Sequence, residues 1–212
     1  CRDPASVRLV AVTKYVDPQV AAMVHAAGCH DLAESRPQAL WEKAGALAGL
    51  VPSPRWHLVG HLQRNKIRRT IPLVTIVHSL DSVRLLDAIE VAAAEAGTSC
   101  PVLVEVNLTD DPGRTGAIPA VAESIVAASA TRPHVDVRGL MGMARLPDGD
   151  VSAARRDFAR LRELRDRLAR SAGVGGLPEL SMGMSGDLEE AILEGATMVR
   201  VGSALFEGLA MP

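Results

Sequence analysis

The sequence predicts a parallel (β/α)8 barrel, a TIM-barrel α/β fold, built as a single domain over residues 1–212. Apolar strand-like runs alternate with helical segments in eight successive units, and no Pro/Ser-rich or low-complexity stretch divides them. Strands that alternate with helices imply a parallel sheet, and eight units in 212 residues fit a barrel near its lower size limit. An open doubly wound sheet is the alternative, because strand counts read from sequence are easily wrong by one or two.

The first unit combines a buried strand with a lysine at its end. Residues 9–12 are continuously apolar, which predicts a strand at 7–14 that is buried on both faces. Asp17 and Pro18 suit the N-cap and first position of a helix at 18–27. Lys14 therefore lies at the carboxyl end of a strand, where barrels of this type carry their active sites. The alternative is a lysine whose long side chain simply extends into water.

The next units repeat this order with short apolar runs followed by segments of helical spacing. The clearest of these helices places Leu85 and Ile89 on one face. The expected strands are 29–33, 55–59, 74–78, 101–106 and 137–141, and the expected helices are 37–47, 61–69, 81–96 and 119–130.

The last units hold the longest helix and the most informative loops. Phe158 and Leu161 belong to an apolar stripe that predicts a helix at 150–171. Strands are expected at 179–182 and 198–201, with a helix at 187–194 between them. Each of these two strands ends in small residues that lead into a further helix, MGMSG at 182–186 and RVGS at 200–203.

These two loops predict an anion site. Small residues let backbone N–H groups approach an anion, helix N-termini add donors, and barrels often bind phosphate after strands seven and eight. Ser185, Gly202 and Ser203 are the candidates. A helix cap or tight turn is the better explanation of either loop alone, but two such loops on adjacent strands, with an arginine in one strand, favour the anion site. Strand alternation places Arg200 in the barrel mouth if the flanking valines face outward. Its guanidinium then needs acceptors, either a ligand or an ion-pair partner.

A strand-end lysine and a phosphate cradle on one face suggest a phosphorylated carbonyl compound that Lys14 holds as a Schiff base. Pyridoxal 5'-phosphate is the first candidate, and a sugar-phosphate aldolase would use the same parts. His57 and His78 end the third and fourth strands, where each could line the mouth or be a hydrogen-bonded packing residue.

Composition argues against several other classes of function. A net charge of -2 and 2% aromatic residues give no basis for nucleic-acid binding, so the basic segment 61–69 is interpreted as a solvated helix face. Three widely spaced cysteines without a CxxC pair predict neither disulfides nor a metal site and indicate a reducing, cytoplasmic setting. No apolar run approaches the roughly 20 residues that span a bilayer, so no membrane partner is expected.

Six motifs spread over the whole chain resemble one known family. They are VAVTKY (10–15), ESRPQ (34–38), WHLVGHLQRNK (56–66), HSLDS (78–82), GLMGMA (139–144) and the segment 180–208. They are similar to the pyridoxal phosphate homeostasis proteins of the YggS/PROSC type, relatives of the alanine racemase N-terminal domain (fold type III). The resemblance implies a barrel without the racemases' C-terminal β domain.

The same resemblance implies the cofactor and its ligands. Pyridoxal phosphate would be held as an aldimine on Lys14, with Arg200 facing the pyridine nitrogen and Ser185, Gly202 and Ser203 holding the phosphate. Further candidate cofactor-binding residues on the family motifs are Ser35, His57, Met143 and Met184.

The resemblance favours a non-catalytic protein that holds pyridoxal phosphate and acts in its intracellular homeostasis and delivery. An arginine at the ring nitrogen disfavours its protonation and weakens the ring as an electron sink. The alternative is an amino-acid racemase of the same fold, which needs a second acid/base, typically a tyrosine. Tyr15 is the one tyrosine, and strand alternation points it away from the site; racemases also carry histidine where Met143 stands.

Three departures from the family pattern are visible. Ser35 replaces an asparagine, Arg114 replaces a lysine, and the helix that usually precedes the first strand is missing, so we expect a trimmed N-terminus. Because no residues remain for a second domain, we also expect a monomer, whose partners would be apo enzymes that it meets transiently.

Overall fold

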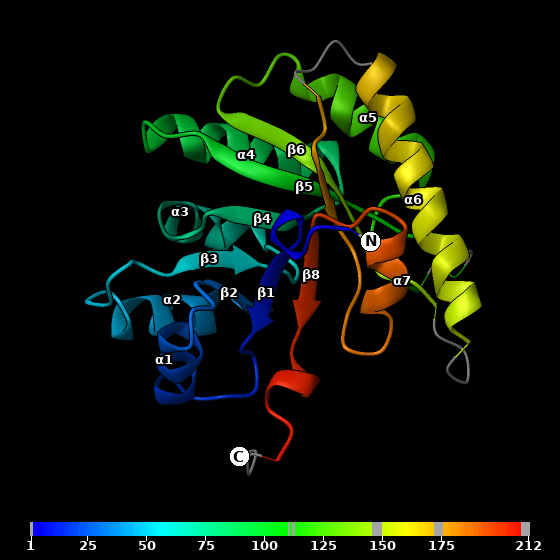
Figure 1. The fold of residues 1–212 in the computed structure, drawn as a ribbon. Coiled ribbons are helices and arrows are strands. Elements are labelled where there is room, and N and C mark those ends of the chain that lie inside the picture. Colours follow the sequence, from blue (N-terminus) through cyan, green and yellow to red (C-terminus); the bar gives the residue numbers. More distant parts are fainter. Residues whose placement is uncertain (1, 110, 112, 146–149, 172–175, 209–212) are drawn as a thin grey trace.

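The computed structural model describes residues 2–109, 111, 113–145, 150–171 and 176–208. Eight parallel strands form a closed barrel in the order β1 to β8, with β1 paired to β8 (Figure 1). This confirms the predicted barrel and excludes the open sheet. The strands are Arg8–Val12 (β1), Asp31–Glu34 (β2), Arg55–Leu58 (β3), Ile76–Leu80 (β4), Cys100–Val106 (β5), Val135–Gly142 (β6), Glu179–Ser181 (β7) and Met198–Val201 (β8).

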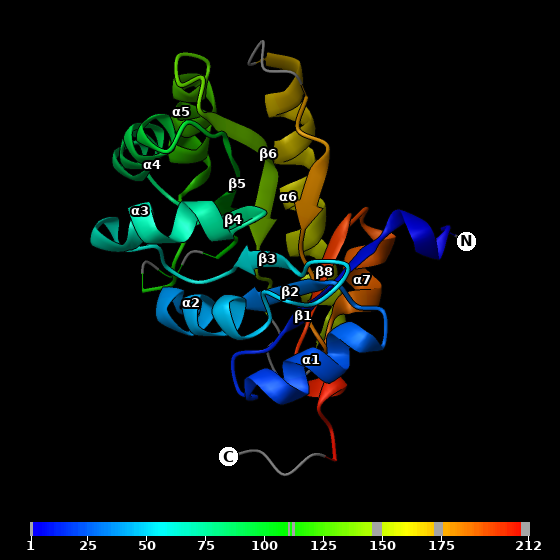
Figure 2. The same cartoon turned by 90° about the vertical axis from the view of Figure 1, so that its left-hand side faces the viewer.

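Helices surround the ring of strands, as the two perpendicular views in Figures 1 and 2 show. The predicted start of α1 is confirmed, because the Asp17 carboxylate accepts a hydrogen bond from the backbone N–H of Val20 at 2.8 Å. Among the described helices, none has the length and apolar character of a membrane span. The α-helices are Pro18–Ala26 (α1), Pro37–Ala46 (α2), Ile67–Thr70 (α3), Val83–Glu95 (α4), Pro119–Ser129 (α5), Val151–Ser171 (α6) and Leu188–Leu193 (α7).

The strands separate two cores. Their outward side chains pack against the helices in one large apolar cluster, which includes Val199 and Val201 of β8. The inward side chains form a much smaller apolar cluster of Val10, Ala33, Ile76, Leu103, Met141 and Met198. Buried polar side chains, among them His57, His78, Ser181 and Arg200, also lie inside the barrel and lead to the site described below.

Two predicted helices differ from the structure. The segment 61–69 is broken into the 3-10 turn Arg64–Lys66 (η2) and the one-turn helix α3, followed by the 3-10 turn Ile71–Leu73 (η3). After β8 the described chain forms a single 3-10 turn, Ser203–Leu205 (η5), instead of the predicted helix. In the first case Leu62 and Ile67 are buried, whereas Arg68, paired with Glu95 at 2.8 Å, and Arg69, stacked on Trp41, remain exposed, so the basic side chains of this segment face solvent as predicted.

Candidate functional site

A pocket of about 380 Å³ opens at the carboxyl ends of the strands. It brings together, from five strand ends, every predicted cofactor-binding residue except His57. The residues that line it are Val12, Lys14, Tyr15, Ser35, Val59, Met141, Met143, Met184, Ser185, Gly186, Arg200, Gly202 and Ser203.

Lys14 lies in a turn just beyond β1, which ends at Val12 and not at residue 14 as predicted. Its side chain is exposed, and Nζ lies 4.7 Å from the centroid of the Tyr15 ring, a cation–π contact. The prediction that Tyr15 points away from the site is wrong, since Tyr15 lines the pocket. The physical reason is that strand alternation no longer applies once the chain has left β1.

A buried ion pair fixes the backbone next to Lys14. Lys43 of α2 donates to the Glu34 carboxylate at 2.5 Å and to the carbonyl of Thr13 at 2.6 Å. The Thr13 hydroxyl donates to the same carboxylate oxygen at 2.7 Å. All three side chains are buried, so α2 and β2 together hold the residue that precedes Lys14.

The loops after β7 and β8, in which the anion cradle was predicted, also line the pocket. The Ser203 hydroxyl donates to the Ser185 hydroxyl at 3.0 Å, which joins the loops after β7 and β8. Gly183 makes the first loop possible, because its φ is +93° and a Cβ there would come within 2.5 Å of Ala191 Cβ. Since the elements that follow are short, hydroxyls and loop backbone form this wall of the pocket.

Arg200 reaches the pocket from inside the barrel, with the predicted orientation. The flanking Val199 and Val201 face the helices, while the guanidinium is buried and lines the pocket. It donates to the carbonyl and hydroxyl of Ser181 at 2.8 and 2.6 Å and to the Gly142 carbonyl at 3.1 Å. Burial lowers the pKa of Arg200 to about 10, so it remains protonated at neutral pH.

His57 does not line the pocket, contrary to the prediction that it binds the cofactor. Its side chain is fully buried one layer below the mouth, and Val59 occupies the lining position on the same face of the chain. The imidazole lies 3.0 Å from the Asp31 carboxylate through Nε2 and 2.9 Å from His78 Nε2 through Nδ1. Both His57 and His78 are therefore hydrogen-bonded packing residues, which was the alternative to lining the mouth.

We expect these two histidines to make the protein less stable in acid. Burial lowers the pKa of His57 from 6.5, and that of His78 lies well below 6.5, so both stay neutral when folded. Below about pH 6.5 the unfolded chain binds more protons than the folded protein, and the free energy of unfolding falls as the pH drops. His78 contributes up to about 1.4 kcal/mol per pH unit between pH 6 and 5, and His57 acts in the same direction.

Urea unfolding of the wild type and of His78→Gln from pH 7 to 5 checks this pH dependence. The free energy of unfolding should fall less steeply with decreasing pH in the variant than in the wild type, by up to about 1.4 kcal/mol per pH unit. Burial raises the pKa values of Glu105 and Asp187, which opposes the slope, but both groups are present in both proteins and cancel in the difference. Parallel curves for the two proteins would contradict the prediction.

Several lining residues were not predicted. Once the strand registers are known, counting alternate residues along each strand from the level of Arg200 identifies Val12, Val59 and Met141 as pocket residues. The registers cannot be read from the sequence. Ser181 is a serine within a strand, and its sequence gives no signal that it holds a guanidinium. In the described part of the chain, no group of three or more histidine, cysteine or acidic side chains could hold a metal ion.

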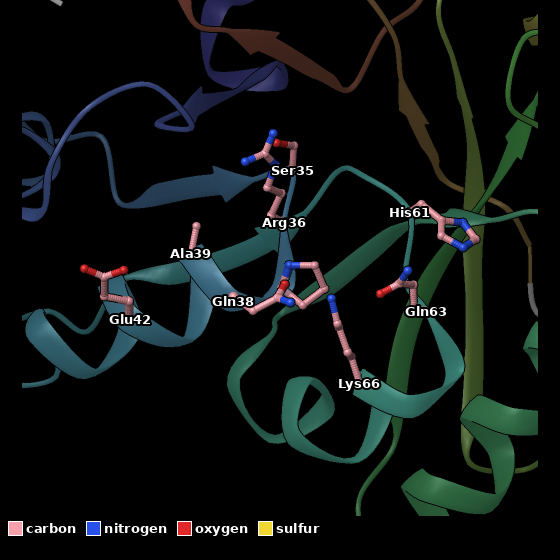
Figure 3. Close-up of a pocket in the computed structure, with 9 residues that line it drawn as sticks. Ser35, Arg36, Gln38, Ala39, Glu42, His61, Gln63 and Lys66 are labelled. Atoms are coloured by element: carbon pink, nitrogen blue, oxygen red, sulfur yellow. The ribbon is translucent and has the colours of Figure 1, made fainter. Parts of the chain in front are cut away.

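A larger cleft of about 630 Å³ adjoins this pocket and shares Ser35 with it (Figure 3). Lys66 points towards the start of α2, whereas Glu42 points away from Lys66. The other lining residues are Arg36, Pro37, Gln38, Ala39, His61 and Gln63. The smaller pocket is the better candidate site, because it combines an amine, a buried guanidinium and two hydroxyls at the barrel mouth.

Comparison with known proteins identifies the family. The alanine racemase N-terminal domain family matches residues 3–209. A pyridoxal phosphate homeostasis protein of Deinococcus radiodurans is 41% identical, over 97% of this chain and 91% of that protein. Another, from Aquifex aeolicus, is 37% identical, over 94% of this chain and 86% of that protein.

Solved structures agree in fold. PipY of Synechococcus elongatus with PLP bound superimposes with a TM-score of 0.90 at 35% identity, covering 97% of this chain and 94% of that chain. An alanine racemase of Clostridium difficile shares the fold with a TM-score of 0.79 at 15% identity, covering 95% of this chain and 55% of that chain. The chain belongs to the pyridoxal phosphate homeostasis proteins, within the alanine racemase N-terminal domain family.

Proposed function

We propose that this protein binds pyridoxal 5'-phosphate in the Lys14 pocket and acts in its homeostasis, as a carrier that delivers the cofactor and does not catalyse a reaction. The observation that carries the proposal is the composition of this pocket. An exposed amine, a hydroxyl pair between two loops and a buried arginine surround about 380 Å³. The bound cofactor in the related PipY structure supports the same assignment.

The pocket residues suit the three functional parts of this cofactor. Pyridoxal phosphate supplies an aldehyde that condenses with amines, a basic ring nitrogen and a phosphate dianion. Lys14 offers the amine for a covalent bond, and Ser185 and Ser203 offer hydroxyl donors for the phosphate. Gly202 keeps the chain close to β1, since a Cβ there would lie 3.3 Å from the Val12 carbonyl oxygen. Arg200 is then the residue that would face the ring nitrogen and donate a hydrogen bond to it.

Two features favour a carrier over an enzyme. Tyr15 contacts Lys14 directly, so both lie on one side of the pocket, whereas two-base racemisation needs groups on opposite faces. An arginine donor at the ring nitrogen leaves that nitrogen unprotonated, which weakens the ring as an electron sink and disfavours a transaminase. The thioethers of Met141 and Met143, which also line the pocket, are not acid/base groups.

We further propose that the carrier works in the cytoplasm. Among the described residues Cys29 and Cys100 are free thiols, which supports a reducing compartment. We also propose that the protein acts as a monomer and meets apo enzymes transiently at the barrel mouth, where the pocket opens.

An absorbance spectrum recorded after incubation with pyridoxal phosphate and desalting tests the binding proposal. We expect a visible band that borohydride converts into a stable label on the wild type and that Lys14→Ala loses entirely. Lys66→Ala is the matched control, because Lys66 lines the neighbouring cleft and should leave the band unchanged. A wild type without a band would refute the binding, and a band retained by Lys14→Ala would refute the role of Lys14.

The loaded wild type then separates the two functions. A carrier restores activity to an apo pyridoxal phosphate enzyme and leaves L-alanine unchanged. Conversion of L-alanine to the racemate at a rate abolished by Lys14→Ala would overturn the carrier proposal in favour of the racemase.

A further inference from the structure

A continuous line of polar side chains crosses the barrel interior and ends at the pocket. It begins at Arg55, which binds the Asp31 carboxylate with two hydrogen bonds of 2.9 and 2.5 Å. His57 Nε2 lies 3.0 Å from Asp31, and His57 Nδ1 lies 2.9 Å from His78 Nε2. His78 Nδ1 in turn lies 3.0 Å from the hydroxyl of Ser181, which accepts from Arg200.

The Asp31 carboxylate and the neutrality of both imidazoles fix the direction of every hydrogen bond in this relay, which runs from Asp31 to Arg200. A carboxylate can only accept, so His57 carries its proton on Nε2 and donates to Asp31. A neutral His57 accepts at Nδ1, so His78 carries its proton on Nε2 and donates to His57. His78 Nδ1 then accepts from the Ser181 hydroxyl, which itself accepts from Arg200.

Burial explains why both imidazoles remain neutral. Burial lowers the pKa of both histidines, and the nearby Arg200 disfavours a further positive charge on His78. Despite its burial, hydrogen bonds from Arg55 and His57 hold the pKa of Asp31 well below its usual range. The relay therefore has one fixed pattern of protons, in which each ring nitrogen of both histidines has a partner.

We propose that His57 and His78, acting through Ser181, are positioning residues for Arg200 and thereby for the cofactor ring. This inference rests on the proposed function, in which Arg200 faces the ring nitrogen. A Ser181 hydroxyl whose proton is committed to His78 can present only lone pairs to Arg200. The guanidinium is then held by three acceptor contacts, two to Ser181 and one to Gly142. The effect of His57 on the cofactor is thus transmitted through His78 and Ser181.

The first test needs neither cofactor nor activity. Nitrogen-15 NMR of histidine-labelled protein reports which ring nitrogen carries the proton, and His57→Gln and His78→Gln assign the two signals. We expect Nε2 protonated and Nδ1 unprotonated for both residues at neutral pH. A charged imidazole or the opposite tautomer at either position would overturn the relay, whether or not the protein binds pyridoxal phosphate.

The second test removes the link between the histidines and Arg200. Ser181→Ala should weaken pyridoxal phosphate binding about tenfold or more, because an arginine loses a hydrogen-bond acceptor. Adding the cofactor should shift the nitrogen-15 NMR signals of the His57 and His78 rings in the wild type. This shift should be absent in Ser181→Ala. The matched control is Ser129→Ala, whose buried hydroxyl donates to the Val126 carbonyl of the same helix, α5, at 2.7 Å.

The outcomes separate this inference from the proposed function. If the wild type fails to bind pyridoxal phosphate, the proposed function is wrong. The histidine tautomers measured by NMR still show whether the hydrogen-bond relay exists. If the wild type binds and Ser181→Ala binds equally well, with the histidine shifts intact, the positioning role is wrong and the proposed function stands.

Discussion

Replacing Lys43 with methionine is expected to lower the free energy of unfolding by about 3–5 kcal/mol, the cost of removing one partner from a buried ion pair. The Lys43 and Glu34 side chains are only 7% and 1% exposed. Glu34 Oε2 has no hydrogen-bond partner among the described residues, so Lys43 is the main compensation for this carboxylate. The substitution also frees the Thr13 carbonyl beside Lys14, and cofactor affinity should fall together with stability.

Urea unfolding at pH 7 measures this effect. Arg68→Met is the matched control, because its ion pair with Glu95 is 76% and 49% exposed and should contribute no more than about 1 kcal/mol. The double variant Lys43→Met with Glu34→Leu should recover much of the loss, since an apolar pair of similar volume leaves no buried charge. A Lys43→Met protein as stable as Arg68→Met would show that the buried pair is not formed.

Gly60→Ala is expected to destabilise the protein by about 3 kcal/mol, as substitutions that crowd a well-packed region do. A Cβ on Gly60 would lie 2.1 Å from the carbonyl oxygen of Ser35 and 2.9 Å from its carbonyl carbon. These are backbone atoms, so the end of β2 must move for the methyl group to fit. Ser35 lines the pocket, and we expect cofactor affinity to fall about tenfold as well.

Gly45→Ala provides the control for Gly60→Ala. Gly45 lies in α2, and no atom of the described chain outside that helix lies within 4 Å of the position that an added Cβ would take. Alanine there should therefore stabilise the protein by about 0.5–1 kcal/mol. The comparison uses urea midpoints and pyridoxal phosphate titrations of both variants. A Gly60→Ala protein with the wild-type midpoint and affinity would show that the β2 and β3 ends do not approach each other this closely.

Local sequence patterns predicted the barrel and the orientation of its last strand well. Two valines flanking Arg200 define which face of β8 meets the helices, and this alternation needs no knowledge of the other strands. The loops at Ser185 and Ser203 were predicted for a similar reason, since small residues after a strand are a local signal.

The errors came from contacts between residues far apart in the chain. β1 ends at Val12, and the buried Glu34–Lys43 pair contacts Thr13 just beyond it, which nothing in residues 7–14 indicates. Tyr15 was therefore oriented wrongly by extending the alternation. His57 was placed at the mouth because its layer in the barrel depends on the registers of β2 to β4. A histidine pair 21 residues apart leaves no periodic pattern.

The pairing of β1 with β8 has a consequence for the order in which the protein matures during synthesis. Arg8 pairs with Met198, so the ring cannot close until residue 198 has left the ribosome. Until then β1 and β7 have unpaired edges, which are templates for association with other chains. Lys14 and Arg200 lie on either side of this last seam. A ligand that contacts both would tether the first strand to the last, and its binding free energy would oppose reopening of the ring.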